Sequence, residues 1–559
     1  MNTTVNPCDD FFQYACGGWI HKNPIPDGEL EYGPFIIAGN EVIIKLKELL
    51  ESNKTITPKC LDMPRILYKK CMSADEREEI ETEQLIDMYR KIGSWPLLEE
   101  DWDSCTFDIT YMLTLIAHTL SNSVLFKFDI TADIKNNTIN SLYIEQTNFG
   151  IGSRVYRRLN RTNFAEYLNA YKEYRLNALK LVLSGANISY NVSQLETAIN
   201  DVIAFEMEIT KFMEPEKNMQ HSSSLFYNKR IIADLYTLCP QIDWLKLIFC
   251  LVPPSVRDII DNNTVIIIRN IGYFRNLSNL LGKTSNRIVA NCIFLQTIDV
   301  WSALLGKAFE NNLEKLTDVL NDIKIIIPRW KGCVEVTETL LKHATSALYV
   351  RKHFDPDIRK DVMDILEGIR EALQDNIAEI DWMDNDTKNA ALQKAAAMIS
   401  KVGYDDMFLN DTALTEYYEK LNITQEDSYF KAVLKIATWE VEKDFLNLKK
   451  PFDRYEFFQT ASTVNAYHEF LTNAVSVPAA FLTPPFFNRN YPKTANYGSL
   501  GAVIGHELTH GFDNSGSLYD MNGNLKNWWS EESYENFKNK TQCFVEQYES
   551  FKVPNMEFK

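Results

Sequence analysis

Helical periodicity dominates the hydrophobic pattern from residue 1 to about residue 400. Apolar and charged residues recur at intervals of three and four, which predicts amphipathic helices over 41–51, 164–183, 194–212 and 360–380. Asp384 is a suitable N-cap for a further helix that we expect to end at Gly403, because aspartate accepts N–H bonds at helix starts and glycine ends helices. This part of the chain contains no internal repeat and no low-complexity linker.

The pattern changes between residues 450 and 500. Segments 463–467 and 474–478 are short, apolar and rich in β-branched residues, and about six residues separate them. This spacing predicts a hairpin or a pair of edge strands, which Pro484 and Pro485 then end.

A short apolar helix is expected next. Its apolar residues stand at helical spacing and could face a core: Leu500, Val503, Ile504 and Leu508. Ser499 could cap its start, and the turn residues 513–516 end it. A helix this apolar should be mostly buried, so polar side chains on it need partners.

This helix carries the sequence H-E-L-T-H, from His506 to His510. Histidines at i and i+4 lie on one helix face, where both imidazoles can reach one metal ion, and Glu507 between them can act as a base. That arrangement is typical of zinc peptidases. The alternative is a helix that carries two histidines by chance, but only 8 of 559 residues are histidine. Composition alone would then give the pattern about 0.01 times per chain.

A catalytic zinc ion needs three protein ligands, so one is missing from this helix. A metzincin would have Gly at 513 and His at 516, whereas this chain has Asp513 and Gly516. A glutamate on a following helix is the other common solution, and Glu531, Glu532 and Glu535 are the candidates. These three could equally be first-turn acidic residues that favour the helix dipole.

Length and charge limit the function classes. A chain of 559 residues exceeds what one core usually supports, so two or more domains are expected. The net charge of −18 argues against nucleic acid and against an anionic membrane surface as partners, and we interpret it as favouring solubility. No apolar run reaches the about 18 residues that a membrane helix needs.

Cysteines and glycosylation sequons indicate an oxidising compartment. The cysteines form no C-x-x-C pair, so disulfides fit better than a cysteine zinc site. The asparagines that head N-x-S/T triplets are Asn2, Asn53, Asn136, Asn160, Asn187, Asn191, Asn262, Asn276, Asn385, Asn410, Asn422 and Asn539. Because the first residues are polar and resemble no signal peptide, we expect an incomplete N-terminus.

The chain resembles the neprilysin-type (M13) zinc endopeptidases from end to end. The segments that carry the resemblance are Pro7–Phe12, Tyr14–Trp19, Pro24–Pro26, Leu348–Val350, Trp382–Asp384, Asn465–Tyr467, Val503–Asp513, Gly523–Leu525 and Trp528–Trp529. The resemblance implies a mainly α fold with small β elements, in which two largely helical domains of the zincin-metallopeptidase type enclose a central cavity. We place the domains at 1–405 and at 406–559, the second being the catalytic one.

The resemblance also implies the roles of individual residues. His506 and His510 are expected to bind one Zn²⁺ ion, and Glu507 to be the general base. Asn465 and Ala466 are expected to hold the main chain of a peptide substrate. Asp513 is expected to support the zinc ligands, and the resemblance makes Cys71 and Cys333 candidates for a disulfide.

The chain departs from the family pattern at its end. The family's third zinc ligand is a glutamate in a G-E-N-x-A-D motif, and the sequence reaches Lys559 without one. Cys8, Cys16 and Cys543 resemble positions that pair with cysteines beyond that point. We therefore expect a truncated form with weak zinc binding and little activity.

The predicted function is zinc-dependent hydrolysis of peptide bonds in small peptides, at the cell surface or outside the cell. The full-length parent is expected to be a membrane-anchored ectodomain or a secreted protein. The alternative is a non-catalytic extracellular peptide-binding protein.

Overall fold

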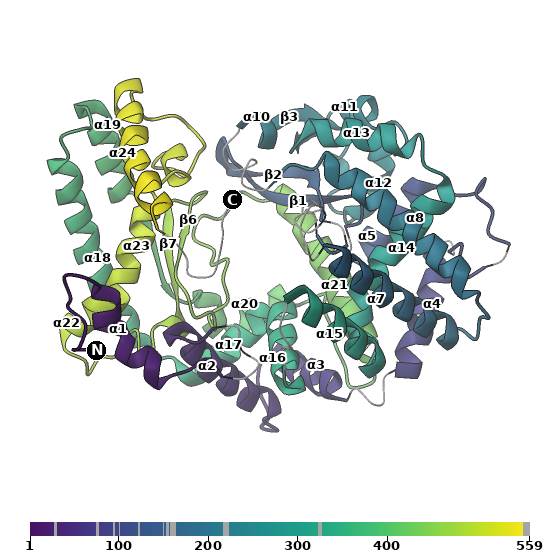
Figure 1. Ribbon diagram of the computed structural model, residues 1–559, viewed down its shortest axis with the longest axis horizontal. Coiled ribbons are helices and arrows are strands. Elements are labelled where there is room, and N and C mark those ends of the chain that lie inside the picture. The colour runs from purple at the N-terminus through teal and green to yellow at the C-terminus, as the bar shows by residue number, and fades with distance from the viewer. Residues whose placement is uncertain are drawn as a thin grey trace. The chain divides into compact units, whose positions relative to one another are not determined.

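The computed structural model describes residues 1–26, 29, 31–73, 78–92, 95–99, 101–120, 123–148, 150–152, 156, 164–215, 223–321 and 327–551. Asn160 and Lys559 lie outside these residues. The chain forms two compact units (Figure 1). Unit 1 contains 1–131, 140–349 and 407–451, and unit 2 contains 132–139, 350–406 and 452–559. The domain boundary expected at residue 405 stays a prediction.

Unit 1 is mainly helical. Its helices are α1 (Phe11–Lys22), α2 (Pro34–Glu51), α3 (Met63–Met72), α4 (Glu78–Ile92), α5 (Ile109–Leu120), α7 (Phe164–Gly185), α8 (Val192–Lys211), α10 (Ser223–Phe226), α11 (Ile232–Leu238), α12 (Trp244–Leu251), α13 (Ile271–Leu281), α14 (Asn286–Trp301), α15 (Lys307–Asn321), α16 (Arg329–Leu340), α20 (Asp411–Tyr417) and α21 (Tyr429–Leu446). Helix α17 (Lys342–His353) begins in unit 1 and runs into the first residues of unit 2. Short 3₁₀ turns, such as Lys59–Asp62, link some of these helices.

A small sheet accompanies the helices of unit 1. Its strands are β1 (Phe126–Asp133), β2 (Asn136–Gln146), β3 (Asn228–Ile231) and β4 (Val265–Ile268), in the order β1-β2-β4-β3. Strands β2 and β4 are parallel, with Leu142 opposite Ile266, whereas β3 runs antiparallel to β4. The tip of the β1–β2 hairpin, residues 132–139, belongs to unit 2.

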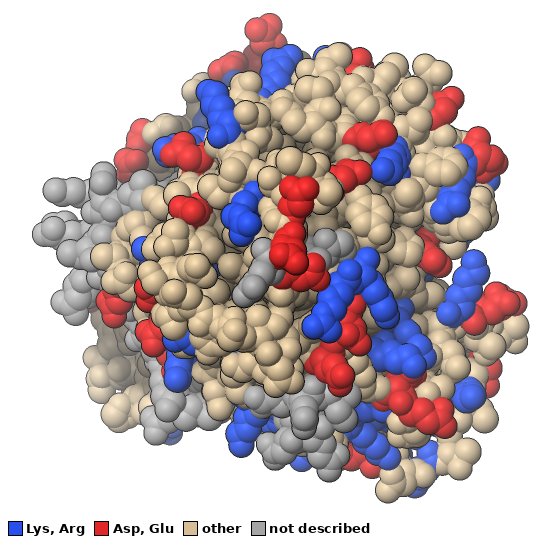
Figure 2. Space-filling model, turned by 90° about the vertical axis from the view of Figure 1, so that its right-hand side faces the viewer, with Lys and Arg blue, Asp and Glu red and all other residues tan. Residues whose placement is uncertain are grey.

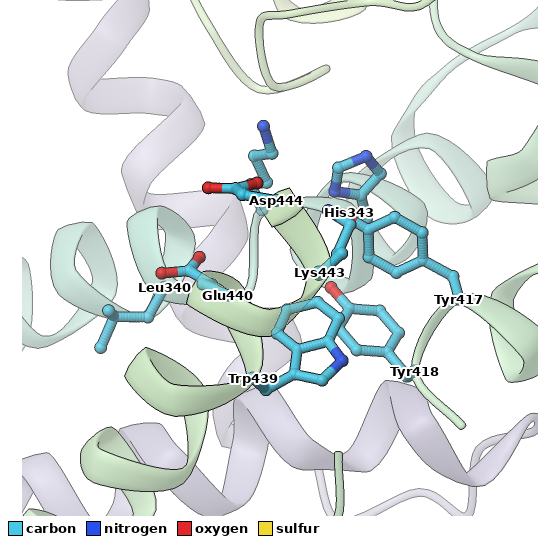
Figure 3. A pocket seen from close by; sticks show the side chains of 9 residues that line it. Leu340, His343, Tyr417, Tyr418, Trp439, Glu440, Lys443 and Asp444 are labelled. Atoms are coloured by element: carbon cyan, nitrogen blue, oxygen red, sulfur yellow. The ribbon is translucent and has the colours of Figure 1, made fainter. Parts of the chain in front are cut away.

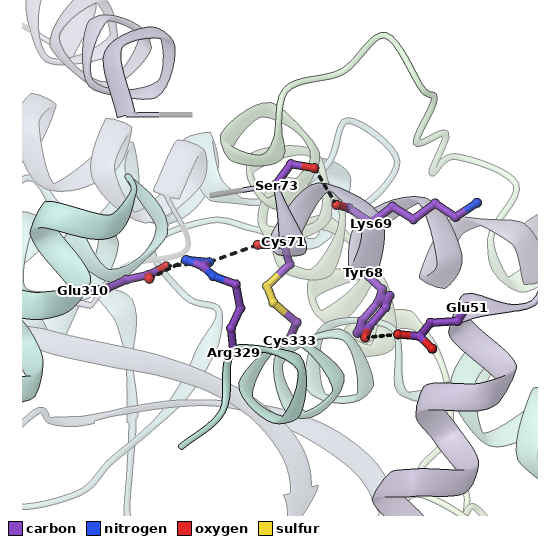
Figure 4. The surroundings of a disulfide bond; sticks show 8 residues. All are labelled: Glu51, Tyr68, Lys69, Cys71, Ser73, Glu310, Arg329 and Cys333. Atoms are coloured by element: carbon purple, nitrogen blue, oxygen red, sulfur yellow. Dashed lines mark hydrogen bonds and ion pairs between the residues drawn. A yellow bond between two sulfur atoms is a disulfide. The ribbon is translucent and has the colours of Figure 1, made fainter. Parts of the chain in front are cut away.

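A disulfide and a buried ion network hold unit 1 together. Cys71 on α3 and Cys333 on α16 form the disulfide, with a Cα–Cα distance of 5.7 Å (Figure 4). Arg329 at the start of α16 donates to the main-chain oxygen of Cys71 over 3.2 Å. Elsewhere, the guanidinium of Arg175 is fully buried and bonds Glu206 over 2.8 Å and Asp299 over 2.7 Å.

Unit 2 combines helices with a three-stranded sheet. The helices are α18 (Pro356–Glu379), α19 (Asn385–Ala396), α22 (Lys493–Asn496), α23 (Ala502–His510) and α24 (Glu531–Glu549), and a π-helical stretch, Tyr497–Gly501, joins α22 to α23. The strands are β5 (Ile399–Gly403), β6 (Tyr467–Glu469) and β7 (Ala474–Pro478). Their order is β5-β7-β6, with β5 parallel and β6 antiparallel to the central β7.

Asp384 caps α19 and also binds two side chains at the start of α24. Its carboxylate accepts N–H bonds of 3.0 Å from Asp386 and Thr387 at the start of α19. It also accepts bonds from the hydroxyls of Ser530 and Ser533 at the start of α24. These hydroxyl and amide donors, led by Ser530 and Ser533, hold the pKa of the carboxyl below its usual range. The predicted cap is therefore present, and it also fixes α24 against α19.

Helices predominate and the sheets are small, so the expected mainly α fold with small β elements is confirmed. The four predicted amphipathic helices correspond to α2, α7, α8 and α18. The helix expected to reach Gly403 is a wrong prediction, because it ends at Ala396 and strand β5 occupies 399–403. The first predicted hairpin strand also begins later than expected, at Tyr467.

Charged side chains of both signs are mixed on the face that Figure 2 shows. On the face in Figure 2, acidic and basic groups alternate without a large area of one sign. In the described part of the chain, no helix is long and apolar enough to cross a bilayer.

Candidate active site

The helix that bears His506 is the end of a longer helical run. Ser499 was a candidate N-cap, but it lies within the π-helical stretch, and its hydroxyl donates to the carbonyls of Phe486 (2.6 Å) and Ala495 (2.7 Å). The helical run instead begins at Lys493. Leu500, Ile504 and Leu508 are buried, as their spacing predicts, and Val503 is half-buried. The buried face leaves the histidines on the other side of α23.

His506 and His510 turn their Nε2 atoms toward one point. The two atoms are 2.9 Å apart, and the ring centroids are 4.4 Å apart. Two ligands of a tetrahedral zinc ion, each at about 2.0–2.1 Å, are separated by roughly 3.3 Å. His506 is exposed and His510 half-buried, so an ion can reach both from solvent. The pair therefore fits two ligand positions of a zinc site.

Asp513 orients the second histidine. Its Oδ2 lies 2.7 Å from Nδ1 of His510, and its Oδ1 accepts N–H bonds from Ser515 (2.8 Å) and Gly516 (2.7 Å). Because the carboxylate accepts a proton-bearing Nδ1, the lone pair of His510 is left on Nε2, the atom that faces His506. A single side chain thus sets the tautomer of His510 and closes the turn after α23.

Glu507 is buried on the same helix. Its side chain is 6% exposed, and burial raises the pKa of its carboxyl. The neighbouring histidines and a main-chain N–H of His468 on β6 act in the opposite direction.

Asn465 and Ala466 precede the edge strand of the sheet. Strand β6 pairs with β7 on one side, and no described strand pairs with its other side. Asn465 is exposed and its Oδ1 accepts from the N–H of Ala466, which is buried (2.9 Å). An extended peptide can add to such an edge by main-chain hydrogen bonds.

Lys394 was not predicted from sequence, yet it holds the segment that follows α23. Its buried ammonium donates to three main-chain oxygens, those of Gly511 (2.6 Å), Gly516 (2.7 Å) and Tyr519 (2.7 Å). Burial lowers the pKa of Lys394 to about 7, an effect that Asp520 and Asp513 oppose. Through these three hydrogen bonds, Lys394 fixes the conformation of the segment that contains Asp513.

The candidate third ligands do not join the histidines. Glu531, Glu532 and Glu535 lie in the first turns of α24, after its N-cap Ser530. Within the described ranges, no group of three or more His, Cys, Asp or Glu side chains could hold a metal ion. The first-turn position of Glu531 and Glu532 agrees with the alternative that these residues favour the helix dipole.

The sequence matches two models described as peptidase family M13, over residues 7–405 and 465–558. Neprilysin-11 of Caenorhabditis elegans is 36% identical over 561 residues, which cover all of this chain and 66% of that protein. Neprilysin-1 of the same organism is 34% identical, over 99% of this chain and 74% of that protein. Endothelin-converting enzyme 1 of Bos taurus is 32% identical, over 99% and 72%.

Solved structures agree on the fold. The Mycobacterium tuberculosis zinc metalloprotease Zmp1, in complex with an inhibitor, superposes with a TM-score of 0.84 at 24% identity, over 99% of this chain and 80% of that one. PepO from Lactobacillus rhamnosis has a TM-score of 0.85 at 19% identity, over 98% and 83%. On these matches, and with H-E-L-T-H on a helix beside an open strand edge, the chain belongs to peptidase family M13.

Proposed function

We propose that the protein is a zinc endopeptidase that hydrolyses peptide bonds in small peptides. The observation that carries this proposal is the convergence of the two Nε2 atoms of His506 and His510, with Glu507 between them and Asp513 behind His510. His506 and His510 are the proposed ligands of one zinc ion, and Asp513 is the residue that keeps His510 in the ligating tautomer.

Glu507 is the proposed general base. When bound, zinc lowers the pKa of water toward about 7 and polarises the scissile carbonyl. Glu507 accepts the proton of the attacking water at a carboxylate oxygen and then transfers it to the leaving amine. The position of Glu507 on α23, between the two proposed ligands, supports this role.

The strand edge is the proposed substrate platform. An extended peptide lies along β6, where Asn465 and Ala466 hold its main chain through the side-chain amide and backbone groups. These hydrogen bonds recognise the main chain of the substrate rather than its side chains. The site therefore favours extended peptides over folded proteins. Peptides are accordingly the proposed partners.

An extracellular or cell-surface location is also part of the proposal. Its support is the disulfide between Cys71 and Cys333 and the many N-x-S/T triplets, both typical of oxidising compartments. The proposal includes a membrane anchor in the full-length protein.

The test uses the full-length protein, a quenched fluorescent peptide and zinc analysis. Glu507→Gln should lower kcat by about 10²–10⁴-fold, the usual contribution of a general base, while bound zinc stays near one ion per chain. Glu371→Gln, an exposed glutamate on α18, is the matched control and should leave both values unchanged. Activity of Glu507→Gln within tenfold of the parent protein would disprove the assignment of the base.

A further inference from the structure

Lys394 joins the end of α23 to another helix of unit 2. It lies in the last turn of α19, and its side chain is buried, with 2% exposed. Its ammonium donates to the main-chain oxygens of Gly511 (2.6 Å), Gly516 (2.7 Å) and Tyr519 (2.7 Å). An ammonium has three N–H groups, so each of them already has an acceptor. Lys394 therefore holds one chain segment, residues 511–519, and has no donor left for a substrate.

The partners of Lys394 show that it holds main chain rather than an acidic side chain. Among the described residues, no carboxylate forms an ion pair with it, and Asp520 and Asp513 act on it only as nearby charges. The rings of Phe512 and Trp528 flank the ammonium, with 5.5 and 5.6 Å between Nζ and the ring centroids. Carbonyl oxygens and aromatic rings thus enclose the cation, and its position determines where those carbonyls lie.

Asp513 lies inside the segment that Lys394 holds. Its Oδ1 accepts the N–H of Gly516, whose own carbonyl oxygen binds Lys394. Helix α23 ends at His510, and it holds Asp513 only weakly, because the main-chain N–H of Asp513 lies 3.4 Å from the oxygen of His510. The position of the Asp513 carboxylate therefore depends on the segment and not on the helix.

This carboxylate in turn orients His510, since its Oδ2 lies 2.7 Å from Nδ1 of the ring. We propose that Lys394 is a positioning residue for His510 as a zinc ligand. The ammonium fixes residues 511–519, the segment places Asp513, and Asp513 keeps the lone pair of His510 on Nε2. This inference rests on the proposed peptidase function, in which His510 binds zinc.

The test replaces Lys394 by methionine, which has a similar length and no N–H donor. Zinc affinity is measured in the full-length protein by competition with a chromophoric chelator. Lys394→Met should bind zinc about 10- to 100-fold more weakly, the usual effect of losing support behind a ligand. Loss of a positive charge near the site would by itself strengthen the binding of a cation, so a weaker affinity cannot be an effect of charge.

Two control variants remove a lysine elsewhere. Lys388 also lies on α19 and donates to one main-chain oxygen of α18 over 3.1 Å. Lys443 of unit 1 lies over the rings of Tyr417 and Trp439 (Figure 3). Lys388→Met and Lys443→Met should each bind zinc within about twofold of the parent protein, as expected for substitutions away from the site.

A double variant separates positioning from a general loss of structure. If Lys394 acts through Asp513, Lys394→Met combined with Asp513→Asn binds zinc no more than about threefold more weakly than the weaker single variant. Losses that multiply would show independent effects and would overturn the proposal. A parent protein that binds no zinc would overturn the proposed function and this inference together. Zinc binding that is equal in the parent and in Lys394→Met would overturn this inference alone.

A second variant covers the case in which Lys394→Met does not fold. Lys394→Gln keeps two amide N–H donors for the carbonyls and should bind zinc about fivefold more weakly than the parent, as for the loss of one hydrogen bond. Circular dichroism reports whether each variant keeps its helices. Parent-like zinc affinity of a folded Lys394→Gln protein would contradict the positioning role. Loss of the helix signal in both variants would also contradict it, because Lys394 would then serve folding alone.

Discussion

Replacing Asp513 by asparagine should weaken zinc binding without unfolding unit 2. In the parent protein, one carboxylate oxygen accepts from the Nδ1 side of His510 and the other accepts the N–H groups of Ser515 and Gly516. Asparagine has one acceptor oxygen and one donor nitrogen. If the asparagine oxygen still accepts the N–H bonds of Ser515 and Gly516, the asparagine amide N–H faces the N–H of His510. Two hydrogen-bond donors then oppose each other.

The magnitude follows from the role of such partners. Loss of a hydrogen-bonded group behind a ligating histidine typically costs about 10- to 100-fold in metal affinity, or about 1.4–2.7 kcal/mol. Asp513→Ala should cost at least as much, because it also removes both acceptors of the turn. Asp386→Asn is a suitable control, since Asp386 is an exposed aspartate on α19, in the same unit but away from the histidines.

The assay is competition for Zn²⁺ between the full-length protein and a chromophoric chelator at pH 7.5. Circular dichroism and the thermal midpoint report whether the variant is folded. Our reasoning would be refuted by a folded Asp513→Asn protein that binds zinc as tightly as the parent. Weaker binding that appears only together with loss of helix signal would also contradict it, because the effect would then be structural.

Three further predictions concern stability. Arg175→Met should lower the free energy of unfolding of unit 1 by about 3–5 kcal/mol in urea titrations, because it leaves the buried carboxylate of Glu206 without its counter-charge; a loss below about 1 kcal/mol would contradict this. The double variant Cys71→Ala/Cys333→Ala should lose about 2–5 kcal/mol, since the bond closes a separation of 262 residues, and calorimetry should show no such loss for Cys105→Ala, an exposed free thiol. Gly516→Ala should cost about 1–3 kcal/mol in thermal unfolding, because its Cβ would lie 1.9 Å from a carbonyl oxygen of the catalytic helix; an unchanged midpoint would show that the turn can move.

The sequence predicted what depends on local spacing. Histidines four residues apart on an apolar helix specify their own geometry, so the positions of His506, Glu507 and His510 follow from the pattern alone. The N-cap of α19 and the helical periodicity of unit 1 are local in the same sense. The roles assigned to these side chains stay predictions until the variants are measured.

Contacts between distant segments could not be predicted in this way. Lys394 looks like a solvent-facing lysine on an amphipathic helix, and its three acceptors lie 117, 122 and 125 residues further along the chain. Gly403 was expected to end a helix, but pairing of 399–403 with β7 places that glycine at the end of a strand, with φ of +89°. Pairing with β7 thus decided whether residues 399–403 form a helix or a strand.

The way the chain alternates between the two units has a consequence for biosynthesis. Strand β5 of unit 2 leaves the ribosome long before its neighbour β7, and the segment 407–451 of unit 1 is made between them. Unit 1 can fold completely once residue 451 has emerged from the ribosome. Unit 2 cannot be complete before α24 has been synthesised, although its residues 132–139 are synthesised early. Because domains tend to fold as units during synthesis, unit 1 should be folded before the helix that carries His506 and His510 can pack in unit 2.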